Sequence, residues 1–238
     1  MYDGMYYYDG RIRYSEVDSE GKLTIVSLLD YFQDCSTFHS EDLGLGVEYL
    51  REHGLVWVLA SWQIVVERSP RLCERVEIGT APYEFKAFMG MRNFAMTTPQ
   101  GECLAKANSV WTLLDVNTGK PALPTEEMLN GYVIREKLDM EYAPRKIVIP
   151  GEGTRREPIV VKKHHLDTNH HVNNGQYVAM ALEFVPEHFP IHQLRAEYKR
   201  QAFLDTVLVP RVAVGERSVT VDLSDEQGAM YFTAEFTA

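Results

Sequence analysis

Residues 164–174, HHLDTNHHVNN, gather four histidines and one aspartate, which can transfer protons, and three asparagines, which can form hydrogen bonds. Within this run Asp167, Asn169 and His171 alternate by two, and on an extended segment alternate side chains point to the same side. A carboxylate, an amide and an imidazole on one wall can orient a water molecule and stabilise a tetrahedral oxyanion. We therefore expect acid–base chemistry at these three residues.

An apolar segment with helical spacing follows over about residues 173–187, with Asn173 or Asn174 as its N-cap. The amides at the start of a helix are unpaired and carry partial positive charge. An oxygen that becomes negative during a reaction is well placed there. The sequence therefore predicts that the start of this helix contributes to the chemistry.

Two other interpretations of the polar run stay open. His165, Asp167, His170 and His171 are all possible metal ligands, although they lack the i, i+4 helical spacing of the common zinc motif. Alternatively, the polar side chains serve only to cap the helix and to satisfy the backbone of a loop.

The remaining chain shows which elements must position this run. Period-2 patterns and β-branched residues predict strands, and helical spacing predicts a second long helix over about 24–39, with Thr24 as N-cap. Short helical turns are expected near 46–53 and 125–130. The predicted strands cover residues 55–68, 75–85, 91–98, 105–116, 156–166, 192–201, 207–215, 218–224 and 229–238.

The two long helices occur in matching contexts. When the segments are aligned, Asp18 falls on Asp167 and Asp34 falls on Glu183, in both cases 149 residues apart. Each half then consists of a strand, a loop, a long helix and several antiparallel strands, which indicates a duplication. The first copy has Glu20 where the second has Asn169, and also lacks the imidazole. We therefore expect the active centre in the second copy and a different role, such as shaping a pocket, in the first.

A long helix followed by an antiparallel sheet packs by laying its apolar stripe on one face of the sheet. In a duplicated chain, two such sheets can join edge to edge into one continuous sheet. We predict an α+β fold with an N-terminal domain over 1–130, a connector rich in Pro, Gly and charge over 131–157, and a C-terminal domain over 158–238.

Composition excludes several classes of function. The net charge of −10 argues against a nucleic-acid binder, and no run of about 18 apolar residues predicts a membrane span. We expect no secretion signal, because the first residues do not have a basic region followed by an apolar one. Cys35, Cys73 and Cys103 are odd in number and far apart, which favours free thiols in a reducing cytoplasm. Motifs for a nucleophilic serine elbow, a phosphate-binding loop or a Cys-x-x-Cys site are absent.

The run LDTNHHVNNGQYVAMALE (166–183) resembles the Asp-x-Asn-x-His-Val-Asn-Asn motif, with its following Tyr and helix Glu, of the acyl-acyl carrier protein (ACP) thioesterases of plastids and bacteria. Other segments resemble that family in the same order, and the likeness spans roughly residues 10–236. The segments are HGLVWVLASWQIVVERSPRLCERVEI (53–78), GMRNF (90–94), SVWTLLDVNTGKPALP (109–124) and EYKRQAF (197–203).

This resemblance implies a tandem pair of hotdog domains, each a sheet wrapped around a long helix. It implies hydrolysis of the thioester between a fatty acyl chain and the phosphopantetheine arm of ACP, releasing free fatty acid and holo-ACP in fatty acid biosynthesis. ACP is then the partner, and no cofactor or metal is required. Asp167, Asn169 and His171 match the family's catalytic positions, and Glu183 matches the helix acid.

One segment departs from the family pattern. Where the family often has Glu-Cys, this chain has Gln201-Ala202, so a cysteine nucleophile at 202 is impossible. We expect direct attack by water, with Asp167 or His171 as base, Asn169 as positioner and Gln201 as a hydrogen-bonding support. Attack by Asp167 itself through a mixed anhydride stays open.

Two related functions remain alternatives: an acyl-CoA thioesterase, and a non-catalytic acyl-ligand binder on the same fold. ACP is acidic, so productive docking requires a local positive patch on this acidic chain. Candidate contacts are the basic pairs at 155–156, 162–163 and 199–200. The sequence is compatible with a monomer or a homodimer and does not define the acyl length.

Overall fold

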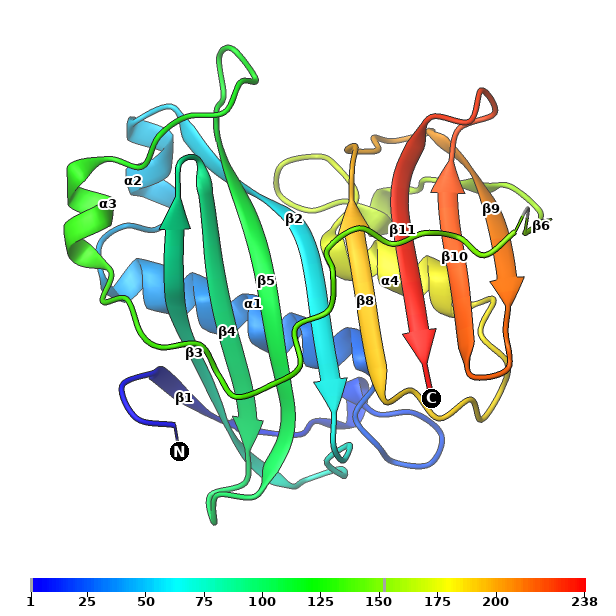
Figure 1. The fold of residues 1–238 in the computed structure, drawn as a ribbon, viewed down its shortest axis with the longest axis horizontal. Coiled ribbons are helices and arrows are strands. Elements are labelled where there is room, and N and C mark those ends of the chain that lie inside the picture. The colour runs from blue at the N-terminus through cyan, green and yellow to red at the C-terminus, as the bar shows by residue number, and fades with distance from the viewer. Residues whose placement is uncertain (1, 152) are drawn as a thin grey trace. The chain divides into compact units, whose positions relative to one another are not determined.

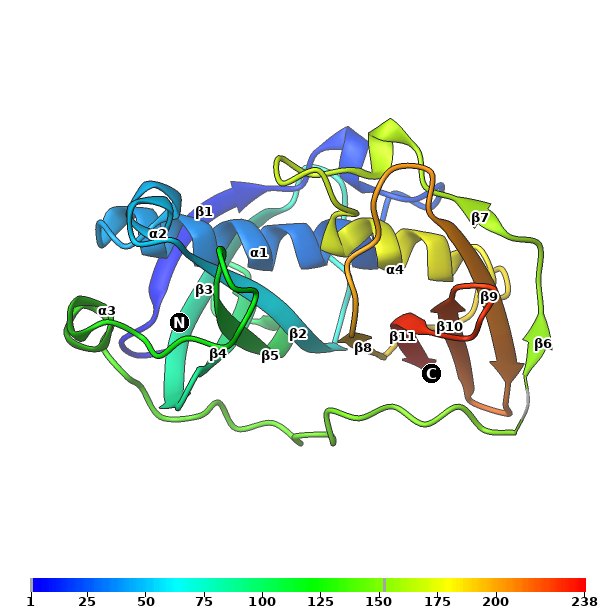
Figure 2. The same cartoon turned by 90° about the horizontal axis from the view of Figure 1, so that it is seen from above.

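The computed structural model describes residues 2–151 and 153–238, and the chain divides into two compact units. The first unit takes in the chain up to Ala60 together with Val66–Tyr142, and the second takes in Ser61–Val65 and Ala143–Ala238. Each unit contains one main helix, α1 or α4, laid against a sheet (Figures 1 and 2). The predicted α+β class is confirmed.

The first unit begins with a short strand and ends in a short helix. Its elements in chain order are β1 (Tyr6–Arg11), the 3-10 helix η1 (Tyr14–Glu16), α1 (Ile25–Asp42), α2 (Val47–Glu52), β2 (Leu55–Val66, shared with the second unit), β3 (Arg75–Lys86), β4 (Met89–Thr97), β5 (Cys103–Asp115) and α3 (Glu126–Gly131).

The second unit repeats the 3-10 helix, the main helix and the strands that follow. Its elements are β6 (Thr154–Arg155), β7 (Ile159–Val160), the 3-10 helix η2 (Lys163–His165), α4 (Asn174–Leu182), β8 (Gln193–Tyr198), β9 (Val207–Val214), β10 (Ser218–Ser224) and β11 (Met230–Thr237).

Helix α1 begins where the sequence predicts it, because the Thr24 hydroxyl accepts the Ser27 N–H at 3.2 Å. Its apolar stripe includes the fully buried Leu29 and Phe32. The Phe32 ring packs against Phe94 of β4 with ring centroids 5.4 Å apart. Burial of each such side chain stabilises the unit by about 2 kcal/mol, so the core holds the helix against the sheet.

In the second unit, helix α4 packs on β10 and β11. Val178 and Ala181 of the helix are fully buried, as are Val221 of β10 and Phe232 of β11. The Tyr177 ring stacks on Phe232 with centroids 5.3 Å apart. The main helix of each unit is therefore anchored by apolar contacts, which leaves its N-terminal loop at the edge of the packed core.

Strand β2 carries pairings for both units. The hydrogen-bonded order is β1-β3-β4-β5-β2 in the first unit and β2-β8-β11-β10-β9-β6 in the second, with β7 also paired to β9. In the second unit, Trp62 of β2 lies opposite Ala196 of β8, and the same Ala196 lies opposite Ala234 of β11. Strand β2 is therefore the last strand in the order of the first unit and the first strand in the order of the second.

Three sequence predictions differ from the structure. Helix α4 ends at Leu182 rather than near 187, because the residue before Pro186 is disfavoured in the helical region. The strand predicted over 156–166 is reduced to β7 and the 3-10 helix η2, where His165 Nδ1 accepts the Lys162 N–H at 2.9 Å. Such a local bond competes with strand pairing. Strand β1 was not predicted.

The duplication is confirmed by equivalent main-chain hydrogen bonds. In the first unit the Leu23 N–H donates to the Pro70 carbonyl at 2.9 Å, and in the second the Val172 N–H donates to the Ala202 carbonyl at 2.9 Å. The loop and main helix of the two units therefore correspond at an offset of 149 residues, and the turn before β3 or β9 corresponds at an offset of 132.

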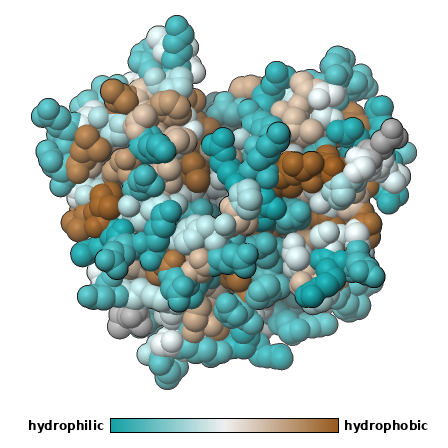
Figure 3. Space-filling view, in the orientation of Figure 1, coloured by the Kyte–Doolittle hydropathy of each residue, from teal (hydrophilic) through white to brown (hydrophobic). Residues whose placement is uncertain are grey.

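The chain between α3 and β6 crosses the sheet face that is turned away from the helices (Figures 1 and 2). In the first unit, buried Asn93 accepts the Leu138 N–H at 3.1 Å and the Tyr142 hydroxyl at 2.9 Å. In the second, Arg195 donates to the Lys146 carbonyl at 3.0 Å. Hydrophilic side chains cover most of this face, with apolar ones in separate clusters (Figure 3). Among the described residues, no helix has the length and apolar character to cross a membrane.

Candidate active site

The polar run forms a tight turn between η2 and α4. Leu166 and Val172 pair as an antiparallel bridge, and the Asp167 N–H donates to the His171 carbonyl at 2.9 Å. His170 has the left-handed φ of 64° that closes the turn. The Asp167 Oδ1 accepts the Asn169 N–H at 2.8 Å, which is an Asx turn.

This geometry corrects the expectation of an extended segment with three side chains on one wall. The turn places Asp167 and His171 opposite one another, with 3.4 Å between Asp167 Oδ2 and His171 Nδ1. Their side chains are 24% and 22% exposed, whereas Asn169 at the tip of the turn is exposed. A carboxylate beside one imidazole nitrogen can orient the ring and leave the other nitrogen for a proton transfer.

The predicted N-cap of α4 is confirmed, but the amides that follow it are not unpaired as expected. The Asn173 side chain accepts the Gly175 N–H at 2.8 Å, which makes Asn173 the N-cap. The Gln176 and Tyr177 amides donate to the Asn173 carbonyl at 3.0 and 3.3 Å. Because these backbone amides already have partners, they are not available to stabilise an oxyanion. The exposed side-chain amide of Asn169 is the better candidate.

A second segment lies directly beside the turn. The Val172 N–H bonds to Ala202, and His171 pairs with Phe203 in an antiparallel bridge. The two rings of that pair meet edge to face, with centroids 6.2 Å apart. Gln201 is exposed and immediately precedes these contacts. The structure therefore brings the backbone of Gln201 next to the turn.

Glu183 is placed elsewhere. It is the exposed C-cap residue of α4, whereas the turn lies at the N-terminal end of that helix. A helix of 9 residues is about 14 Å long. The structure therefore does not bring Glu183 together with Asp167 and His171.

Comparison with known proteins decides the family. The family model of the acyl-ACP thioesterase N-terminal domain matches residues 5–132. The model of the acyl-ACP thioesterase C-terminal domain matches residues 151–211. The chain belongs to the acyl-ACP thioesterase family. The C-terminal match includes the whole turn, α4 and the segment around Gln201.

Several plant proteins of this family are similar to the chain in sequence. A chloroplastic acyl-[acyl-carrier-protein] hydrolase of Cuphea viscosissima is 28% identical over 221 residues, covering 85% of this chain and 52% of the relative. A chloroplastic palmitoyl-acyl carrier protein thioesterase of Arabidopsis thaliana is 25% identical over 221 residues, covering 85% of this chain and 53% of the relative. The chain spans about half the length of the curated relatives it matches.

Solved structures in the acyl-ACP thioesterase family share the fold. The crystal structure of an acyl-ACP thioesterase from Bacteroides thetaiotaomicron superposes with a TM-score of 0.89 at 24% identity, covering 98% of this chain and 97% of that one. The predicted tandem hotdog fold is confirmed.

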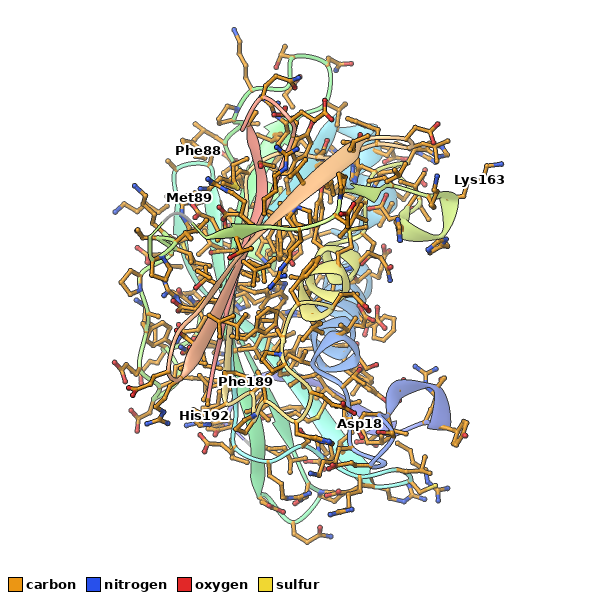
Figure 4. The ribbon with its side chains drawn as sticks, turned by 90° about the vertical axis from the view of Figure 1, so that its right-hand side faces the viewer. Asp18, Phe88, Met89, Lys163, Phe189 and His192 are labelled. Atoms are coloured by element: carbon orange, nitrogen blue, oxygen red, sulfur yellow. The ribbon has the colours of Figure 1, made fainter. Side chains whose placement is uncertain are left out.

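Basic side chains gather beside the turn, although the chain as a whole has a net charge of −10. Lys162 and Lys163 are exposed immediately before the turn, and the Lys163 side chain extends away from η2 (Figure 4). The rings of His164 and His165 lie 4.1 Å apart. Burial, together with the positive field of His164 and Lys162, lowers the pKa of His165. The approach to this family's motif is therefore locally basic.

The free cysteines Cys35, Cys73 and Cys103 all belong to the first unit. Ala202 stands where the family often has cysteine, and it is fully buried. Within residues 2–151 and 153–238, no three His, Cys, Asp or Glu side chains are grouped to hold a metal ion.

Proposed function

We propose that the chain hydrolyses fatty acyl-ACP thioesters in fatty acid biosynthesis, releasing free fatty acid and holo-ACP. The observation that carries this proposal is the placement of Asp167 beside His171 across the turn, with 3.4 Å between Oδ2 and Nδ1, in a chain that belongs to the acyl-ACP thioesterase family. The plant relatives bear the names of acyl-ACP hydrolases.

The geometry supports His171 as the base. In the proposed step, the Asp167 carboxylate accepts a hydrogen bond from His171 Nδ1–H and fixes the ring, so that Nε2 takes a proton from water and the ring becomes an imidazolium. The water oxygen attacks the thioester carbonyl carbon, and the Asn169 amide donates to the oxyanion. When the carbon–sulfur bond breaks, the imidazolium returns the proton to the pantetheine sulfur.

The alternative of nucleophilic attack by Asp167 has less support. Its Oδ1 accepts the Asn169 N–H at 2.8 Å and its Oδ2 faces His171, so both oxygens have partners in the turn. We assign Gln201 a supporting hydrogen bond beside the turn. Glu183 takes no proton in this proposal, because a helix length separates it from the other residues.

ACP is the proposed partner, and the ion pairs separate the basic pair at 199–200 from the pair at 162–163. Lys199 lies 3.4 Å from Glu197, and Arg200 lies 3.7 Å from Asp225, so their charges are partly neutralised. Across the described part of the chain, Lys162 and Lys163 have no carboxylate within 4.0 Å. Lys162 and Lys163 are therefore the preferred contacts for an acidic carrier.

We propose that the first unit shapes the acyl pocket, because its equivalent turn has Glu20 and Lys22 in place of the amide and the imidazole. The free cysteines of this unit support action in a reducing compartment, for which we propose the cytoplasm.

The test is a turnover assay with acyl-ACP, acyl-CoA and acyl-pantetheine at equal concentrations, with release of free fatty acid as the readout. We expect acyl-ACP to give the highest kcat/KM. A preference for acyl-CoA would make the chain an acyl-CoA thioesterase. Binding of all three without product would make it an acyl-ligand binder, and either result would overturn the proposal.

A further inference from the structure

Tyr177 of α4 places a buried hydroxyl against the segment that contains Gln201. The residue is 3% exposed, and its ring is fixed between Phe232 and Tyr198, with centroids 5.3 and 5.9 Å away. The hydroxyl accepts the Ala202 N–H at 2.8 Å and lies 3.2 Å from the Arg200 carbonyl, to which it donates. One phenol therefore holds both peptide groups that flank Gln201.

These bonds matter because Gln201 belongs to no strand and its side chain is exposed. The next residue, Ala202, accepts the Val172 N–H at 2.9 Å, and Phe203 pairs with His171. The Tyr177 hydroxyl therefore connects the rigid core of the second unit, through residues 200–203, to the turn that carries the proposed base.

The first unit builds the same contact without a hydroxyl. Leu28 occupies the position equivalent to Tyr177, and Pro70 the position equivalent to Ala202. Proline has no N–H to satisfy and leucine has no hydroxyl to offer. Nevertheless, the Leu23 N–H still bonds to the Pro70 carbonyl at 2.9 Å. The fold of a unit thus does not require the phenol, and the phenol occurs in the unit with the acid–base residues.

We propose that Tyr177 is a positioning residue that fixes the main chain around Gln201, and so aims the Gln201 amide at the reacting groups held by the turn. This inference rests on the proposed function. Without the hydroxyl, the Ala202 N–H is left buried without a partner, since Ala202 is 0% exposed. The peptide groups beside Gln201 are then free to rotate, and the amide loses its fixed direction.

The main test is a double-mutant cycle between Tyr177→Phe and Gln201→Ala, measured with acyl-ACP. We expect Tyr177→Phe to lower kcat by about 10- to 100-fold, the scale of a misplaced active-site group, with little change in KM. If Tyr177 acts through Gln201, Tyr177→Phe added to Gln201→Ala causes little further loss. Multiplicative losses in the double variant would overturn the proposal.

Tyr142→Phe is the matched control, because the Tyr142 hydroxyl also lies near two acceptors, Asn93 Oδ1 at 2.9 Å and the Leu138 carbonyl at 3.0 Å, but in the first unit. We expect both tyrosine variants to lower Tm by roughly 2–8 °C and only Tyr177→Phe to lower kcat. Equal kcat losses in the two variants would show that general destabilisation is the cause.

A second variant covers the case in which Tyr177→Phe does not fold. Tyr177→Leu combined with Ala202→Pro copies the first-unit solution, which removes the donor and the acceptor together. We expect this protein to fold with a higher Tm than Tyr177→Leu alone and to keep a low kcat. Full activity in the double variant would overturn the proposal.

Amide hydrogen exchange at Ala202 supplies a readout that does not depend on turnover, and we expect faster exchange in Tyr177→Phe. If the wild-type protein does not hydrolyse acyl-ACP, the proposed function and this inference both fall. If the wild type is active and Tyr177→Phe keeps its kcat, only the role of Tyr177 falls.

Discussion

The turn before α1 and the turn before α4 have the same backbone and different side chains. In the first, the Asp18 N–H donates to the Lys22 carbonyl at 2.8 Å, and in the second, the Asp167 N–H donates to the His171 carbonyl at 2.9 Å. The first aspartate accepts the amide two residues later at 2.9 Å, and the second accepts the equivalent amide at 2.8 Å. Asp18 of the first turn is labelled in Figure 4.

The fourth residue of each turn is left-handed, with φ of 73° at Gly21 and 64° at His170. Glycine adopts this conformation without strain, whereas histidine does so at some cost. The second copy therefore keeps a less favourable residue at this place. The turn backbone requires the aspartate and a left-handed residue, and it leaves the other positions free to vary.

The two turns use that freedom differently. In the first, Lys22 pairs with Glu20 at 2.7 Å, so its charge is satisfied within the turn. In the second, His171 faces the turn aspartate, and Asn169 has no charge. One scaffold thus carries a closed ion pair in the first unit and a candidate acid–base pair in the second, which shows that the fold alone does not determine the chemistry.

The largest expected effect comes from removing the imidazole. We predict that His171→Ala lowers acyl-ACP hydrolysis by about 100-fold or more, because it removes the imidazole that faces Asp167 across the turn. The equivalent change, Lys22→Ala, should leave the rate within about twofold, as for most surface substitutions. Steady-state release of fatty acid measures both, and a large loss in Lys22→Ala would contradict the difference between the turns.

Charge reversal at Lys162 and Lys163 is expected to have the next largest effect. We predict that the double change to Glu raises KM for acyl-ACP by about tenfold or more, with acyl-pantetheine unaffected. Reversal at Lys199 and Arg200 should have a smaller effect, because those cations already have acidic partners. Salt should weaken the acyl-ACP reaction selectively as the Debye length falls below about 10 Å. Equal effects on both substrates would show that these lysines are ordinary surface charge.

Periodicity predicted most of the fold, because alternation and helical spacing are local properties of the chain. It identified both main helices, the Thr24 cap and nearly every strand, and the 149-residue offset located the second turn. It did not predict the turn itself, because alternation at 167–171 also fits a strand. The sequence did contain one sign of the turn: the residue equivalent to His170 in the first copy is Gly21, and glycine favours the left-handed conformation.

The candidate site was predictable only in part. Asp167 and His171 are close in the chain, so the motif brought them together, but their opposition depends on the turn. Glu183 was included by resemblance, whereas its distance depends on the length of α4. Tyr177 was included in the motif by resemblance, but its role was not predicted because its partners lie more than 20 residues away. The replacement of Pro70 by an alanine in the second copy was the one sign of a new N–H that requires an acceptor.

A smaller effect is expected in the pH dependence of the unfolding free energy, where His165 can be compared with the equivalent residue Glu16. Because the pKa of His165 is lowered in the folded chain, the folded imidazole takes up its proton at a more acid pH than the unfolded one, whose ordinary pKa is about 6.5. Unfolding free energy therefore falls as pH drops below that value, by no more than about 1 kcal/mol because this site is screened by solvent. Although burial opposes it, hydrogen bonds from Arg13 and Tyr31 lower the pKa of Glu16, so its contribution is lost only at more acid pH.

Urea unfolding at pH 7 and pH 5 tests this difference. We expect His165→Gln to lose less stability over that interval than the wild-type protein, and Glu16→Gln to lose as much as the wild type. An unchanged pH dependence in His165→Gln would show that this imidazole is not held neutral by the fold.

The smallest expected effect is at Glu183. We predict that Glu183→Gln leaves kcat within about twofold, because the residue is exposed at the opposite end of α4 from the turn. Asp34→Asn, the equivalent change in α1, should also leave kcat within about twofold. A loss of kcat confined to Glu183→Gln would return this acid to the site and would imply that α4 is positioned differently during catalysis.

The most direct test of the account is the initial rate of fatty acid release from acyl-ACP by the wild type, Asp167→Asn and Asp18→Asn. Asparagine keeps an oxygen that accepts the turn amide, so both turns should stay intact and thermal unfolding should confirm this. We predict that Asp167→Asn loses about 100-fold in rate, while Asp18→Asn stays close to the wild type. Near-normal turnover by Asp167→Asn, or equal losses in the two variants, would contradict the claim that the second turn carries the chemistry.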